Sequence, residues 1–221
     1  MQTWILNGWA ASPEAWSLCK FEHERMFSYV DQLDGEPEKA LESVERVVLV
    51  GWSMGGSGAL RLAMAHPGKI AGLVLVAATP RMMKDDGWIG MTERRLAALQ
   101  MGLQLTMGGG FFGIPEGRPN PYITDTAENL TRGIDYLRTT DLRGRLCEMS
   151  SQFANIRVEI FQSERDGIVR PSNADFLMRV FPHAKLHIVP GAEHALPVTI
   201  PEQIDTAVAD VSSPIDGMLK K

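Results

Sequence analysis

A serine lies in a Gly-x-Ser-x-Gly pattern, in the pentapeptide GWSMG at positions 51–55. An apolar run, 47–50, comes directly before the pattern, and a small, apolar run without proline, 56–65, follows it. A buried strand, this pattern and then a helix form the context of a nucleophile elbow, a strained turn that exposes a serine hydroxyl. The pentapeptide alone would suit an incidental glycine-rich turn equally well. The prediction that Ser53 is a nucleophile therefore rests on the flanking segments and on the candidate acid and base elsewhere in the sequence.

Two further residues complete a possible catalytic triad. A serine hydroxyl is a poor nucleophile until a base accepts its proton, and the base needs a carboxylate that fixes its tautomer. With this type of elbow the order along the chain is Ser, then Asp or Glu, then His, each just after a strand. Ser53, Asp166 and His194 occur in that order after apolar, strand-like runs. Because ligands bind at the carboxyl ends of parallel strands, we predict that these side chains meet there.

Competing residues fit these roles less well. Of the 5 histidines, only His194 follows a predicted strand on a glycine-containing loop; the others are His23, His66, His183 and His187. Glu164 and Asp175 are alternative acids, but Asp166 opens the run DGIV, a turn of the sort that fixes a carboxylate. An ordinary turn aspartate remains the alternative interpretation of Asp166.

An oxyanion hole would need two backbone N–H groups close to the nucleophile. One belongs to the residue after the serine, Met54, and the other to the loop after the first strand, 7–9, where we assign it to Trp9. The Trp9 ring could also be a core aromatic or line the substrate pocket.

Apolar runs alternating with helical patterns predict the elements that position these residues. The predicted strands are 4–6, 27–30, 46–50, 70–76, 158–161 and 186–189. Strands that alternate with helices imply an α/β fold, with a mainly parallel sheet and helices on both faces.

The pattern changes between 81 and 149, which contains no convincing strand. Leucines recur on one helical face at Leu96, Leu99 and Leu103, and further apolar faces follow up to about 149. We predict that 81–149 is a helical cap inserted into a single domain, 1–221, with a loose tail at 212–221.

Composition excludes several classes of protein. A net charge of -5 and the lack of a Lys/Arg run argue against a nucleic-acid partner. No apolar run approaches the roughly 20 residues that span a membrane, and the N-terminus does not resemble a signal peptide. Cys19 and Cys147 show no metal-ligand spacing, so we interpret both as reduced, partly buried thiols. We therefore predict a cytoplasmic protein without cofactor or metal.

Together these motifs resemble the α/β-hydrolases, and among them the pimeloyl-acyl-carrier-protein methyl ester carboxylesterases of biotin synthesis. The matching segments are GWSMGG at 51–56, LVAATPR at 75–81, YLRTTDLRGRL at 136–146, DGIV at 166–169 and GAEH at 191–194. Three features depart from that group: Asn7 replaces a histidine in the oxyanion loop, the sequence starts at what would be the group's third strand, and the cap looks short.

This resemblance implies a serine carboxylesterase that acts through an acyl-enzyme on a methyl-esterified dicarboxylyl acyl carrier protein. In the resembled esterases, lid arginines contact the acidic carrier, which suggests this role for Arg138 and Arg143; solvated helix faces are the alternative. Phe111 and Phe112 would contact the acyl chain. Together with Met82, Met83, Trp88, Met101 and Met107, they would form an apolar chamber for this chain. The alternative is that these residues only attach the cap to the sheet.

Three other functions remain open at this point. The chain could hydrolyse small-molecule esters of another pathway. It could be a carbon–carbon lyase of menaquinone synthesis, which has the same fold and triad. It could also be a non-catalytic member of the fold that only binds a ligand.

Overall fold

A computed structural model describes residues 1–106, 114–123 and 125–213. Its centre is a six-stranded sheet with the order β2-β1-β3-β4-β5-β6, and every neighbouring pair of strands is parallel. The strands are β1 Gln2–Leu6, β2 Arg25–Phe27, β3 Val47–Trp52, β4 Ile70–Val76, β5 Arg157–Ser163 and β6 Lys185–Val189. The predicted parallel α/β sheet is therefore confirmed.

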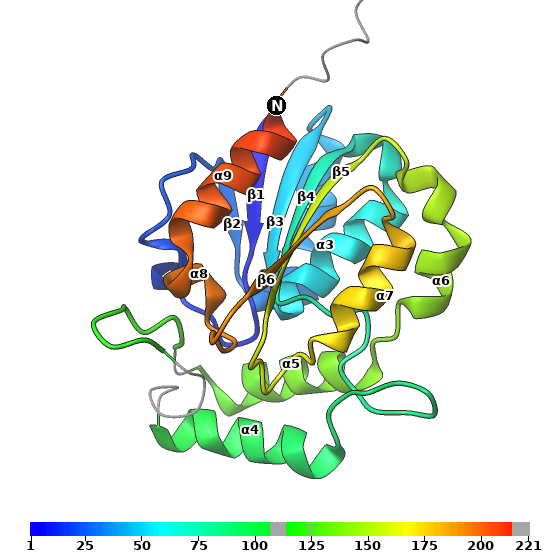
Figure 1. Ribbon diagram of the computed structural model, residues 1–221. Coiled ribbons are helices and arrows are strands. Elements are labelled where there is room, and N and C mark those ends of the chain that lie inside the picture. Colours follow the sequence, from blue (N-terminus) through cyan, green and yellow to red (C-terminus); the bar gives the residue numbers. More distant parts are fainter. Residues whose placement is uncertain (107–113, 124, 214–221) are drawn as a thin grey trace, which may run out of the picture.

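Helices cover both faces of this sheet and one of its ends (Figure 1). The α-helices are α1 Tyr29–Leu33, α2 Glu36–Glu42, α3 Met54–Ala65, α4 Glu93–Thr106, α5 Ala127–Thr139, α6 Arg143–Glu148, α7 Ser172–Val180, α8 Leu196–Thr199 and α9 Pro201–Ser212. The short 3-10 helices are η1 Pro13–Trp16, η2 Pro67–Lys69 and η3 Ser150–Phe153. Within the described ranges, none of these helices combines the length and the apolar character that a membrane span requires.

The central strands are apolar throughout because both of their faces are covered. Val48 and Val50 of β3 belong to the core cluster that contains α9 residues such as Val208. Leu49, between them, belongs to the opposite cluster, with Leu60 of α3. Alternate side chains of a strand point to opposite faces, so a strand between two helical layers has no polar face.

The second strand differs from its predicted bounds. It ends at Phe27, and Ser28 is the N-cap of α1 instead of a strand residue. The Ser28 side chain accepts a hydrogen bond from the Asp31 N–H, and the Asp31 carboxylate accepts one from the Ser28 N–H. This capping box stabilises a helix start, so the prediction of a strand over 28–30 was wrong.

Helices α4 and α5 lie across the end of the sheet opposite the N-terminus, which is the carboxyl end of the parallel strands (Figure 1). Helix α6 lies beside α7, and its Leu146 packs into the core cluster on the α3 side of the sheet. The cap bounds of 81 and 149 remain a prediction, and most of the predicted tail lies outside the described residues.

The two cysteines differ in exposure. Cys147 is exposed, which corrects the prediction that it is partly buried, whereas Cys19 is partly buried and both are free thiols. Burial raises the pKa of the Cys19 thiol to about 12, and the carboxylates of Asp205 and Glu202 add to this. Cys19 therefore stays protonated at neutral pH.

Candidate active site

Ser53 occupies a strained turn between β3 and α3. Its backbone has φ 56° and ψ -118°, in the positive-φ region that side chains disfavour. Its N–H donates to the carbonyl of Val76 at the end of β4 (2.9 Å), which fixes the turn to the sheet. The predicted strand–serine–helix geometry is thus present, with the serine at the carboxyl end of β3.

The glycines of the pentapeptide are required by close backbone contacts. A Cβ on Gly51 would lie 2.5 Å from the Gly55 carbonyl oxygen, and a Cβ on Gly55 would lie 1.9 Å from the Leu6 carbonyl oxygen. The next glycine, Gly56, would place a Cβ 2.3 Å from the Cβ of Ala78. Helix α3 therefore starts against β1 and the loop after β4, and only glycine permits this distance.

Replacing Gly55 with alanine should destabilise the protein by at least about 3 kcal/mol, because the added methyl group meets backbone that cannot rotate away. Urea denaturation measures this loss. The matched control is Gly144→Ala in α6, where a Cβ would have no atom within 4 Å. Equal stabilities of the Gly55 and Gly144 variants would contradict the steric explanation.

A continuous chain of hydrogen bonds links the three predicted triad residues. His194 Nε2 lies 2.9 Å from Ser53 Oγ, and His194 Nδ1 lies 2.8 Å from Asp166 Oδ2. All three side chains are buried, with exposed fractions of 8% for Ser53, 2% for Asp166 and 4% for His194. The structure thus brings together residues that are far apart in the sequence, in the arrangement of a nucleophile, its base and an orienting carboxylate.

Backbone contacts hold Asp166 and His194 in place. The other carboxylate oxygen of Asp166 accepts hydrogen bonds from the N–H groups of Ile168 (2.8 Å) and Val169 (2.9 Å). The carbonyl of His194 accepts the indole N–H of Trp52, the residue before the nucleophile (3.1 Å). Both loops are therefore fixed before any ligand binds.

The loop after β1 lies against the nucleophile. A Cβ on Gly8 would be 3.3 Å from Ser53 Cβ, so this glycine permits close approach of the loop. Among the described residues, neither the backbone N–H of Trp9 nor that of Met54 donates a hydrogen bond. Two free donors beside the serine are what an oxyanion hole needs, and this role of Trp9 and Met54 remains a proposal.

Asn7 is a structural anchor of this loop. Its buried side-chain oxygen accepts the indole N–H of Trp16 (2.5 Å), and its carbonyl accepts the side-chain amide of Gln32 (2.8 Å). The sequence indicated Asn7 only as a departure from the resembled group. Its partners, in η1 and α1, could not be identified from spacing.

Known proteins with the same pattern support this interpretation of the fold. Residues 6–210 match the model of the alpha/beta hydrolase family. The chain belongs to this family. A pimeloyl-[acyl-carrier protein] methyl ester esterase of Yersinia enterocolitica is 28% identical over 76% of this chain and 70% of that protein. The corresponding esterase of Serratia marcescens is 25% identical over 92% of this chain and 91% of that protein.

A solved structure shows the same fold. An esterase of Exiguobacterium antarcticum superposes with a TM-score of 0.75 at 19% identity, over 96% of this chain and 92% of that one. At this identity the likeness establishes the fold and does not establish the substrate.

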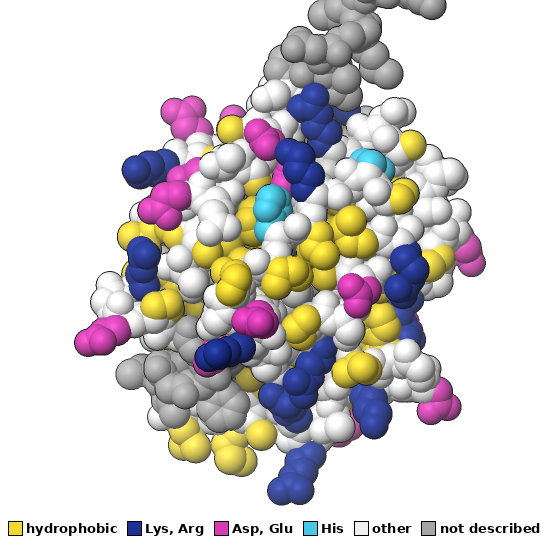
Figure 2. All heavy atoms as spheres, viewed as in Figure 1, with side chains coloured by type: hydrophobic (Ala, Val, Ile, Leu, Met, Phe, Trp, Pro, Cys, Tyr) yellow, Lys and Arg dark blue, Asp and Glu magenta, His cyan; other side chains and the backbone are white. Residues whose placement is uncertain are grey.

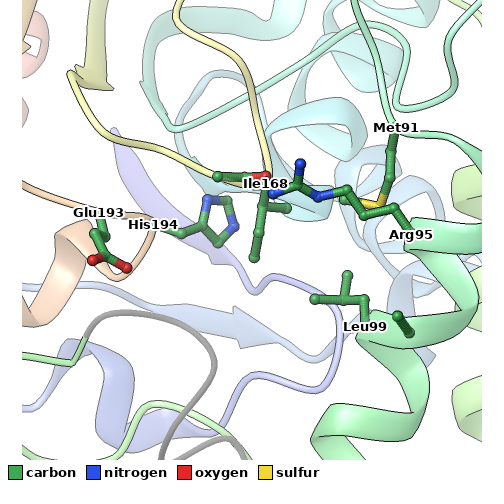
Figure 3. A pocket seen from close by; sticks show the side chains of 8 residues that line it. Met91, Arg95, Leu99, Ile168, Glu193 and His194 are labelled. Atoms are coloured by element: carbon green, nitrogen blue, oxygen red, sulfur yellow. Dashed lines mark hydrogen bonds between the residues drawn. The ribbon is translucent and has the colours of Figure 1, made fainter.

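A pocket of about 190 Å³ lies beside His194, and Ser53 is not among the residues that line it (Figure 3). Its walls come from α4, from Met91 just before α4, and from the loops that contain Asp166 and His194. The lining residues are Met91, Arg95, Ala98, Leu99, Gly167, Ile168, Glu193 and His194. An apolar cavity of roughly 150 Å³ can bind benzene, so this pocket fits a group of about that size.

The residues predicted to form the acyl-chain chamber differ in their exposure, and some of them lie outside the described ranges. Phe111, Phe112 and Met107 lie outside the described residues. Met82, Met83 and Trp88 are buried, whereas Met101 is 62% exposed and does not belong to an apolar chamber.

The Trp9 ring packs against the cap helix α5. Its indole N–H donates to the carbonyl of Leu130 (3.1 Å), and a Cβ on Gly133 would lie 2.3 Å from the ring. The predicted contact of this ring with substrate remains a prediction, since the ring is not among the side chains that line the described pocket.

The two arginines predicted to contact a carrier form ion pairs within the chain. Arg143 contacts the carboxylates of Asp85 (2.5 Å) and Asp141 (2.7 Å) and lies over the ring of Trp88. The hydrogen bonds that Arg143 donates to these carboxylates, first to Asp141, raise the pKa of Arg143. Arg138 contacts Glu93 (3.0 Å) and Asp135, and all three side chains are substantially exposed.

Tyr122 and Trp52 are further components of the site that sequence reasoning did not identify. The Tyr122 ring lies 5.6 Å from that of Trp52, whose own ring lies 5.7 Å from the His194 ring. Burial, and then the charge of Asp166, raise the pKa of the Tyr122 phenol well above its usual value. Tyr122 is therefore neutral and adds no charge beside the triad.

Proposed function

We propose that this protein is a serine carboxylic-ester hydrolase with Ser53 as nucleophile, His194 as base and Asp166 as the carboxylate that orients His194. The observation that supports this most is the hydrogen-bond chain from Asp166 through His194 to Ser53, which lies on a strained elbow with positive φ. Membership of the alpha/beta hydrolase family and similarity to two esterases agree with this reaction class.

In the first half of the reaction, Ser53 Oγ attacks the ester carbonyl carbon while His194 Nε2 accepts the serine proton. The carbonyl oxygen becomes an oxyanion, which the N–H groups of Trp9 and Met54 would stabilise. The bond to the alcohol then breaks, and His194 donates its proton to the departing alkoxide. This leaves an acyl group on Ser53.

In the second half, water attacks the acyl-enzyme and gives its proton to His194. The bond between the acyl carbon and Ser53 Oγ breaks, and the proton returns to the serine. Asp166 accepts a hydrogen bond from His194 Nδ1 throughout, so that Nε2 is the nitrogen that exchanges protons with Ser53.

As the substrate, we propose a methyl-esterified dicarboxylyl acyl carrier protein. Two relatives are named as esterases of this kind of substrate. Lys and Arg side chains gather around α4 on the face shown in Figure 2. Exposed ion pairs contribute little stability, so Arg138 can exchange Glu93 and Asp135 for the carboxylates of a carrier at small cost. Arg143, held by two carboxylates and stacked on Trp88, is better suited to stabilising the cap.

Turnover of a carrier-bound ester should weaken as salt rises from 0.1 M to 1 M, because the Debye length falls from about 10 Å to about 3 Å. Arg138→Glu should lower this turnover and leave hydrolysis of p-nitrophenyl acetate unchanged. Arg46→Glu is the matched control, because Arg46 is exposed just before β3, at the amino-terminal end of the parallel strands and away from α4 (Figure 1). Equal losses on both substrates would count against carrier docking.

A small-molecule esterase is the second candidate, favoured by the small volume of the described pocket and the ion pairing of Arg143. p-Nitrophenyl esters of increasing chain length, compared with the carrier-bound methyl ester, separate the two candidates by their kcat/KM. Labelling of Ser53 by a fluorophosphonate would distinguish either enzyme from a non-catalytic binding protein. Turnover of esters would distinguish them from a lyase.

A further inference from the structure

Arg95 extends from the first turns of α4 toward the loop between β5 and α7, and its side chain lines the pocket beside His194 (Figure 3). One guanidinium nitrogen donates to the carbonyl of Gly167 (2.6 Å), the residue after Asp166. The side chain is thereby held at the pocket wall, while its remaining N–H groups have no acceptor among the described residues.

The charge of Arg95 has no carboxylate beside it in the part of the chain that the structure describes. Within the described ranges no carboxylate lies within 4.0 Å of its guanidinium, in contrast to Arg132, Arg138 and Arg143, which all form ion pairs. Glu193 also lines the pocket, but its carboxylate lies on the other side of the His194 ring (Figure 3). The exposed Arg95 side chain therefore brings a positive charge to the pocket wall, and this charge has no carboxylate partner among the described residues.

The rest of the pocket wall is largely apolar. Ile168 lies between His194 and Arg95, and Met91 and Leu99 lie on either side of the Arg95 side chain (Figure 3). Apolar walls with one well-placed charged group are the usual composition of a small-molecule site, in which the charged group fixes the orientation of the ligand. A short carbon chain ending in a carboxylate has the matching chemistry, because guanidinium and carboxylate form paired hydrogen bonds.

We propose that Arg95 binds a carboxylate in the pocket beside His194 and determines specificity for esters of dicarboxylic acids. This inference rests on the proposed esterase activity of Ser53. The carboxylate has two possible sources. It is either a free acid group already on the substrate, as in a half-ester, or the acid group that hydrolysis creates.

Arg95 could instead act only by fastening α4 to the loop of Asp166. In that case its loss would shift the loop and slow the hydrolysis of every ester alike, mainly through kcat. Specific binding of a carboxylate would change KM, and only for substrates that carry the charge. The two roles therefore differ in a measurable way.

The test compares monomethyl with dimethyl esters of succinate, glutarate and adipate. Arg95→Gln should lower kcat/KM for the half-esters by about ten- to a hundredfold, mostly through KM, since a charge-assisted hydrogen bond is lost. The dimethyl esters should be hardly affected. Arg95→Lys should retain part of the preference because it keeps the charge. Arg94→Gln is the matched control, since Arg94 is exposed on the same helix, as Arg95 is, but does not line the pocket.

A second arm identifies the source of the carboxylate. If hydrolysis creates it, wild-type protein should show no preference for half-esters, but free glutarate should inhibit, and Arg95→Gln should relieve that inhibition. Equal losses on monomethyl and dimethyl esters, with inhibition unchanged, would overturn the proposal and leave Arg95 a positioning residue.

Calorimetric titration of glutarate into the Ser53→Ala protein, with and without Arg95→Gln, needs no turnover. Binding that depends on Arg95 supports the proposal even where hydrolysis is absent, and its absence in both proteins counts against it. Failure of wild-type protein to hydrolyse any ester would overturn the esterase function alone. The two failures are thus distinguishable.

Discussion

Replacing Ser53 with alanine should lower kcat for ester hydrolysis by about a millionfold, as in serine hydrolases whose triad acts as one unit. The reason is that Ser53 Oγ is the atom 2.9 Å from His194 Nε2, and alanine leaves the base without a nucleophile to activate. Hydrolysis of a p-nitrophenyl ester by purified variant and wild-type protein measures the ratio. Retention of more than about a tenth of the activity would remove Ser53 from the mechanism.

Ser57→Ala is the matched control for this substitution. Ser57 is a buried serine one turn further along α3, and its hydroxyl donates to the carbonyl of Thr79 (2.6 Å), away from His194. Its loss should cost stability of about 1 kcal/mol and leave the chemistry intact. Similar inactivation of both variants would indicate damage to α3 instead of loss of the nucleophile.

Replacing Asp166 with asparagine should lower kcat by about ten-thousandfold, through the tautomer of His194. One oxygen of Asp166 accepts the N–H groups of Ile168 and Val169, so the asparagine carbonyl will occupy that position. Its NH₂ group must then face His194 Nδ1, 2.8 Å away in the wild type. His194 can only accept this hydrogen bond with its own proton on Nε2, where it can no longer take the proton of Ser53.

The shape of the side chain is unchanged in Asp166→Asn, so the thermal transition should move little while activity collapses. Asp175→Asn in α7 is the control, because Asp175 is exposed and was the alternative acid in the sequence. A large loss of activity in the Asp175 variant, with a small loss in the Asp166 variant, would show that Asp166 is not the carboxylate that orients His194.

The sequence by itself determined the sheet and the chemical core of the site. Strands covered on both faces leave continuous apolar runs such as 70–76, which need no knowledge of their partners to be found. The elbow is equally local, because Gly51, Gly55 and the strained Ser53 lie within five positions of each other. Asp166 and His194 could be selected since each follows a strand, and parallel strands end at one edge.

Only the tertiary structure decided what lies around that core. The sequence spacing could not reveal that Arg143 forms an ion pair with Asp85, which is distant in the sequence, and the docking role of Arg143 stays a prediction. The bounds of β2 changed because the Ser28 capping box outcompeted the apolar pattern. The position of Arg95 at the pocket wall depends on the packing of α4 near the Asp166 loop, where Arg95 donates to the carbonyl of Gly167. Local patterns fix elements because neighbours in sequence are always close in space, whereas a charge acquires its role from the groups that folding brings beside it.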